Sequence, residues 1–245
     1  MRNRNFYIII VLLLVMVGLN VNSITSMGFV NWLVQEILLL PGIVIGLSFH
    51  EFGHALVSDR LGDPTPRQQG RLTINPGAHI DWIGFLCLLI AGFGWGIPVQ
   101  IDTRYYMRPR RDELLVSIAG VAMNLLVAVV FAFLIRILIS AGFFDLRILS
   151  SNGTASFLFR IFYYVIMINV VLMIFNLIPV PPLDGFGIIT QIFDLRKYDW
   201  YYTFYNNGMF ILLLLIMFNV TRLILDPATQ GICGAIMKNI AGIAV

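Results

Sequence analysis

Residues 47–58 read Leu-Ser-Phe-His-Glu-Phe-Gly-His-Ala-Leu-Val-Ser, so that His50, Glu51 and His54 stand together inside an apolar segment. Residues four apart lie on one face of a helix, which places His50 and His54 side by side with Glu51 next to them. In zinc hydrolases this H-E-x-x-H spacing supplies two imidazole ligands and a glutamate that serves as general base. The sequence therefore predicts a metal-binding helix around residue 50.

The composition indicates that this helix lies in a membrane. Hydrophobic residues make up 59% of the chain and charged residues 12%, about half the charged fraction of a typical soluble protein. Ionisable side chains are costly at membrane depth and mark a functional site there by default. The formal net charge of +3 is too small and too scattered for a nucleic-acid surface, so we expect the lipid bilayer as a partner and no nucleic acid. Cys87 and Cys233 suggest neither a disulfide framework nor a cysteine zinc site.

Long apolar runs predict an all-α polytopic membrane protein with about five to six transmembrane helices. We expect one domain over residues 1–245, with its core at roughly 33–190. Asp226 and Pro227 are expected to end the last span, and the residues after them stay unassigned. Residues 186–207 are interpreted as a mixed polar and aromatic connection. The predicted spans are residues 6–19, 33–60, 114–139, 160–178 and 208–225.

A second motif, residues 176–185, reads Asn-Leu-Ile-Pro-Val-Pro-Pro-Leu-Asp-Gly. Its prolines cannot continue a helix, so the chain must leave the preceding span just before Asp184. Irregular backbone at membrane depth is tolerated only where protein or a watery cavity satisfies it. Asp184 is therefore a candidate third metal ligand, and a solvated Asp184 in a surface loop fits these residues equally well. His79 is a further candidate ligand, with a hydrogen-bonded or gating role as its other interpretation.

Two weaker segments follow the H-E-x-x-H helix and predict a small re-entrant or β-hairpin element. Residues 70–77 lie between turn signals and are interpreted as a short strand. Residues 83–97 are apolar, but they contain several glycines and are too short for a span. The two motifs can meet only if their helices run in the same direction, so we expect residues 83–97 to enter from the cytosolic side and return without crossing. The arginine-rich residues 102–113 then share the cytosolic side with Arg2 and Arg4.

The two motifs together resemble the site-2 protease family of intramembrane zinc metalloproteases. Residues 50–54 match its H-E-x-x-H motif and residues 176–185 its N-x-x-P-x-x-P-L-D-G motif, and the likeness covers roughly residues 40–190. Ser58 stands where the family commonly has alanine, and Val121 where it commonly has proline. No stretch is long enough for an inserted PDZ domain or an appended CBS pair, so the resemblance is to a minimal member.

The resemblance implies that His50, His54 and Asp184 bind one Zn²⁺ per chain and that Glu51 is the general base. It also implies that the substrate is a transmembrane segment of another protein. Asn124 and Asn176 are candidates for holding that segment or the oxyanion, and interhelical hydrogen bonds are an equally good interpretation of both.

We therefore expect an intramembrane zinc metalloendopeptidase that cuts peptide bonds in or near transmembrane segments. It is expected to be a multi-pass protein of the cell (plasma) membrane with its active site toward the cytosolic side. Two other functions fit the same ligands: a membrane metal-ion transporter, and a catalytically silent scaffold that keeps the zinc. The sequence indicates neither the substrate's identity nor the oligomeric state.

Overall fold

The structure, a computed structural model, describes residues 25–91, 94–144 and 153–243, together with positions 14, 15, 17, 18 and 21. The described residues form helices and turns without a strand, and they confirm the all-α polytopic prediction. The α-helices are α2 (Phe29–Arg60), α3 (Thr65–Gln68), α4 (Trp82–Ala91), α5 (Pro109–Ser140), α6 (Thr154–Asn176), α7 (Asp184–Phe193), α8 (Trp200–Met217) and α9 (Val220–Ile236).

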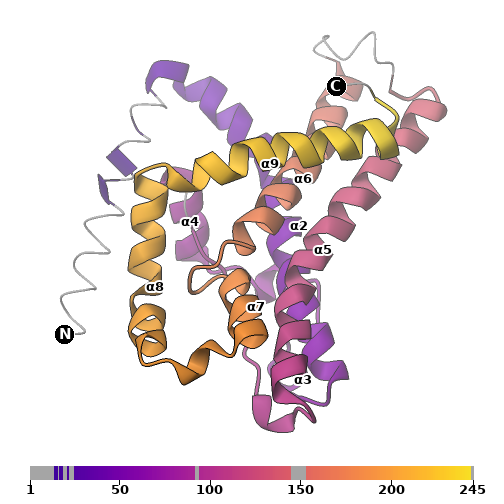
Figure 1. The fold of residues 1–245 in the computed structure, drawn as a ribbon. Helices are drawn as coiled ribbons and strands as arrows, with labels where there is room; N and C mark the ends of the chain where they lie inside the picture. Colours follow the sequence, from indigo (N-terminus) through magenta and orange to yellow (C-terminus); the bar gives the residue numbers. More distant parts are fainter. Residues whose placement is uncertain are drawn as a thin grey trace.

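Three long helices, α2, α5 and α6, pack against one another and form the centre of the molecule (Figure 1). Each is long and apolar enough to cross a membrane, and α8 with α9 forms a bent pair that passes the same test together. Most of the predicted span at residues 6–19 lies outside the described residues, so the count of five to six spans stays a prediction.

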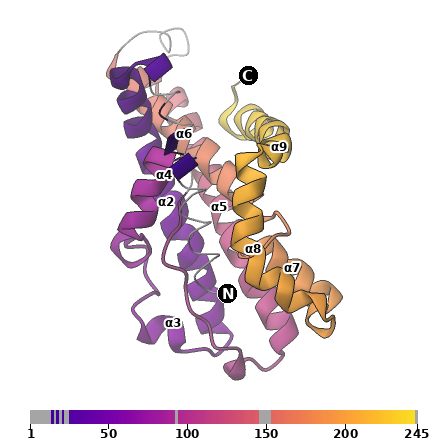
Figure 2. The same ribbon diagram turned by 90° about the vertical axis from the view of Figure 1, so that its left-hand side faces the viewer.

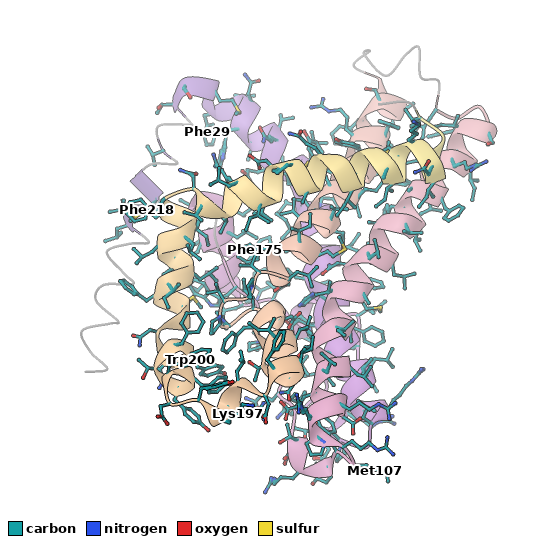
Figure 3. All side chains as sticks on the ribbon, in the orientation of Figure 1. Phe29, Met107, Phe175, Lys197, Trp200 and Phe218 are labelled. Carbon is teal, nitrogen blue, oxygen red and sulfur yellow. The ribbon has the colours of Figure 1, made fainter. Side chains whose placement is uncertain are left out.

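The C-terminal part of the chain differs from the expected single span at residues 208–225. α8 ends at Met217, Asn219 adopts a positive φ of 57°, and α9 then runs on through Pro227 at 71° to α8. Asparagine tolerates the left-handed conformation, so Asn219 can accommodate the break between the two helices. An internal proline costs a helix one hydrogen bond without always ending it. Phe218 marks the corner between the two helices (Figure 3).

The residues after Pro227, which the sequence left unassigned, contribute side chains to the main apolar core. Cys233 and Met237 are buried there against Ile166 and Val170 of α6 and Ala128 of α5. Figure 1 shows α9, in yellow, crossing α6 and α5 in the upper part of the molecule. Figure 2, turned by 90°, shows α8 leading from the level of α7 to α9. Residues 186–207, expected as a connection, are mostly helical and contain most of α7 and the beginning of α8.

The segment between α2 and α5 contains no strand at residues 70–77, so that prediction is wrong. Pro76–Ala78 form a 3₁₀ turn, and the Asn75 side chain accepts a hydrogen bond from the Gly77 amide. Asparagine followed by proline favours such a turn over an extended strand. The only strand-like pairing among the described residues is one isolated antiparallel bridge between Ile80 and Gly96.

That bridge joins a residue just before the predicted re-entrant segment, residues 83–97, to a residue near the end of this segment. Besides the Ile80 to Gly96 pairing, the Ile97 amide donates a hydrogen bond of 2.7 Å to the His79 carbonyl. The chain therefore leaves through α4 and comes back to its starting point, as a dip requires and a crossing does not. Trp82 and Ile83 of α4 are exposed apolar side chains, which suits contact with lipid. The depth of α4 in the membrane stays a prediction.

Candidate metal centre

His50 and His54 lie one turn apart within α2, which is continuous from Phe29 to Arg60. Their imidazole Nε2 atoms are 3.1 Å apart, so the helix turns both rings to the same point. His50 is buried, and His54 is mostly buried beside it. The geometry that the H-E-x-x-H spacing predicts for these two side chains is therefore present.

Asp184 reaches the two histidines from the first turn of α7. Its Oδ2 atom lies 3.2 Å from His50 Nε2 and 3.3 Å from His54 Nε2. α6 ends at Asn176, before the proline-rich turn, as the lack of proline amide hydrogens dictates. Of the two interpretations left open for Asp184, the geometry matches the one that brings it to the histidines.

These three side chains could hold a metal ion. Ligands about 2.0–2.1 Å from a tetrahedral zinc lie roughly 3.3–3.4 Å from one another, close to the observed separations. Asp184 Oδ2 is buried and accepts no hydrogen bond. A buried carboxylate oxygen without a donor is costly unless a cation neutralises it, so this donor set fits zinc.

The second nitrogen of each histidine is held by α5. His50 Nδ1 lies 2.8 Å from Asn124 Oδ1, and His54 Nδ1 lies 2.7 Å from the Val116 carbonyl. Both acceptors favour the tautomer with hydrogen on Nδ1, which leaves the Nε2 lone pairs free for a metal. The long helix α5 therefore orients both rings.

Of the two asparagines considered for substrate binding, Asn124 is already fully engaged with protein atoms. Besides meeting His50, its Nδ2 donates to the Gly46 carbonyl and to Asn169 Oδ1, both at 3.0 Å. This is the interhelical alternative, joining α2, α5 and α6. Asn176 donates to the Leu172 carbonyl of its own helix at 2.9 Å.

Glu51 has a backbone partner that the sequence did not indicate. Its Oε2 accepts a hydrogen bond of 2.9 Å from the Val99 amide, in the extended chain that returns from α4. Pro98 could have suggested extended backbone here, but nothing in the sequence links Val99 to Glu51. The contact holds one carboxylate oxygen and leaves the other available.

Gly120 is a second residue that sequence reasoning missed. A Cβ atom at this position would lie 2.4 Å from His54 Nε2 and 2.6 Å from His50 Cε1, closer than atoms approach. Only glycine therefore lets α5 pass this close to the two rings. The neighbouring small residues Ala119 and Gly120 were the available signal, since small residues permit close helix packing in membranes.

His79 is fully buried but is not part of the three-residue cluster. Its Nε2 lies 2.7 Å from the Thr73 carbonyl, whereas Nδ1 has no hydrogen-bond partner. The geometry matches the hydrogen-bonded interpretation of this histidine and not the ligand interpretation.

Comparison with known proteins places these features in a family. Residues 38–218 match the model of peptidase family M50. The putative zinc metalloprotease YwhC of Bacillus subtilis is 39% identical over 166 residues, which are 66% of this chain and 74% of that protein. The putative zinc metalloprotease Rip2 of Mycolicibacterium smegmatis is 33% identical over 160 residues, 62% of this chain and 56% of Rip2. The zinc metalloprotease MJ0392 of Methanocaldococcus jannaschii is 28% identical over 191 residues, 78% of this chain and 42% of MJ0392.

The chain thus spans little more than half of Rip2 and less than half of MJ0392. No solved structure matches the chain.

Proposed function

The chain belongs to peptidase family M50, the site-2 protease family, and is a membrane zinc metalloprotease; from this premise we propose that it hydrolyses peptide bonds in or near transmembrane segments of other membrane proteins. The observation that carries the proposal is the position of the cluster. His50 and His54 lie on α2 and their hydrogen-bond partners on α5, and both helices are long and apolar enough to span a membrane.

His50, His54 and Asp184 are the proposed ligands of one zinc ion per chain. A zinc ion bound there would acidify a water molecule and polarise the scissile carbonyl. The Nδ1 contacts of the histidines support this assignment, since the same hydrogen bonds that fix the rings leave Nε2 unprotonated.

Glu51 is the proposed general base. The Val99 amide fixes its Oε2, so that Oε1 can take the proton from water and then pass it to the leaving amine. This hydrogen bond fixes the side-chain conformation of Glu51, so that the carboxylate is already oriented for proton transfer.

The substrate must present an extended segment, because an intact helix hides its carbonyls in its own hydrogen bonds. We propose that the site faces the cytosolic side of the plasma membrane. Asp63, after α2, accepts a hydrogen bond of 2.8 Å from the Asp102 amide, so the loops that follow α2 and precede α5 lie together. The arginines before α5 are at this same end, which is the arrangement that the positive-inside rule favours for cytosolic loops.

Replacing Glu51 by glutamine tests the proposal. Glu51→Gln should reduce cleavage of a reconstituted transmembrane peptide by about 10²–10⁴-fold, the usual contribution of a general base, while zinc stays bound. The readouts are product formation by mass spectrometry and zinc per chain by metal analysis.

Undiminished cleavage by Glu51→Gln would contradict the mechanism. Wild-type protein that moves metal across vesicles but cuts none of the candidate peptides would favour the transporter. Wild-type protein that does neither would favour the silent scaffold.

A further inference from the structure

α7 carries Asp184 on its first turn, yet this helix is only ten residues long. A proline-rich turn precedes it, and Asp194, with a positive φ of 54°, ends it. The turn packs closely against the start of α7, because a Cβ atom at Gly185 would clash with the carbonyl oxygens of Leu177 and Ile178. The contacts of α7 with α5 add a second constraint on the position of Asp184.

α7 lies along α5 in an antiparallel register. At one end, Gln191 meets Glu113 on the first helical turns of α5. One turn further, Gly187 packs so close to Ser117 that a Cβ atom would lie 2.8 Å from its hydroxyl. One more turn brings Asp184 to the level where α5 passes the two histidines. The spacing along both helices is three to four residues, so these contacts follow one face of each.

A polar cluster around the buried Glu113 and Gln191 holds the far end of α7, and we name it the Glu113 clamp: Arg110, Glu113, Gln191 and Arg196. Glu113 is 8% exposed and accepts hydrogen bonds from Gln191 Nε2 at 2.6 Å and from both terminal nitrogens of Arg196. Arg110 donates to the carbonyls of Gln191 and Ile192, which the end of α7 leaves without helical partners.

The Glu113 clamp contains an ion pair between Glu113 of α5 and Arg196, which follows α7. The hydrogen bond from Arg196 to Glu113 raises the pKa of Arg196 further above its ordinary value, so the guanidinium stays protonated. The Glu113 carboxylate is buried, whereas the Arg196 side chain is 48% exposed, so the ion pair adds little stability. A well-attested use of buried charged groups is to fix one register between elements. A slip of α7 by one turn along α5 would break every one of these bonds and carry Asp184 away from the histidines.

We propose that the Glu113 clamp positions Asp184, so that residues at one end of α7 set the metal affinity at the other. This inference rests on the proposed ligation of zinc by Asp184. The clamp residues are positioning residues, since none of them belongs to the three-residue cluster.

The test uses the full chain in nanodiscs and reads out the metal site directly. Glu113→Gln keeps the side-chain shape and removes the charge. It should lower zinc affinity, measured by competition with a chelating dye, by about 10-fold to 100-fold, as loss of supporting contacts does elsewhere. It should also change the absorption spectrum of the Co²⁺-substituted protein. Asp59→Asn is the matched control, because Asp59 pairs with Arg67 outside the contact of α7 with α5 and should leave both readouts unchanged.

Arg110→Gln covers the case in which Glu113→Gln fails to fold, because Arg110 is exposed and holds only carbonyls of α7. It should shift both readouts in the same direction. Wild-type zinc affinity and an unchanged Co²⁺ spectrum in the folded variants would overturn the inference. If Asp184→Ala itself keeps wild-type zinc affinity, the ligand assignment fails instead, so the two failures are distinguishable.

Discussion

The two histidines enter the metal centre from the interior of a helix of 32 residues, whereas Asp184 enters it from the first turn of a helix of ten. Each histidine also has its own hydrogen bond to α5, and Asp184 Oδ2 has none. The two histidines, which we call the histidine half of the metal centre, are therefore positioned by local spacing and by direct contacts. Asp184, the aspartate half, depends on the position of the whole short helix α7.

Removing a ligand should have the largest effect and should separate Asp184 from His79. Asp184→Ala is expected to lower zinc affinity by more than about 100-fold, beyond the loss of a supporting contact. His79→Ala should bind zinc as the wild type does, because His79 lies outside the cluster. Metal analysis of both purified variants decides this, and loss of zinc in His79→Ala alone would reverse the assignment.

The second largest effect should come from crowding the two histidine rings. Gly120→Ala puts a methyl group 2.4 Å from His54 Nε2, so α2 and α5 must separate or the rings must rotate. We expect a destabilisation of about 1–3 kcal/mol, typical of overpacking, together with loss of zinc. Gly231→Ala is the control, since that position is open. Thermal unfolding with and without a chelator measures both effects, and a Gly120→Ala protein with wild-type zinc content would contradict the close approach.

The smallest of the three effects should follow loss of a supporting contact to one ring. Asn124→Ala removes the acceptor of His50 Nδ1 and should weaken zinc binding about 10-fold to 100-fold. Asn176→Ala should leave zinc affinity unchanged, because Asn176 bonds to its own helix. Dye competition measures the two constants. If Asn176→Ala weakened zinc binding more than Asn124→Ala, the supporting role would belong to Asn176 and our assignment to Asn124 would be wrong.

The sequence predicted most of the histidine half, because a spacing of four residues becomes a shared face in any helix. It also predicted that prolines release Asp184 from the preceding span. It did not predict the contact of Val99 with Glu51 or the Glu113 clamp, since each joins residues tens of positions apart. Local signals also misled: Pro227 was expected to stop a helix that instead breaks at Asn219.

The bend between α8 and α9 has a consequence for how the protein occupies the bilayer. A helix of 17 residues, the length of α9, is roughly 26 Å long. If α8 runs along the membrane normal, a helix tilted by 71° from it advances only about 8 Å in depth. α9 then widens the footprint of the protein in the plane of the membrane and leaves its thickness almost unchanged, so residues 220–243 stay close to the depth at which α8 ends.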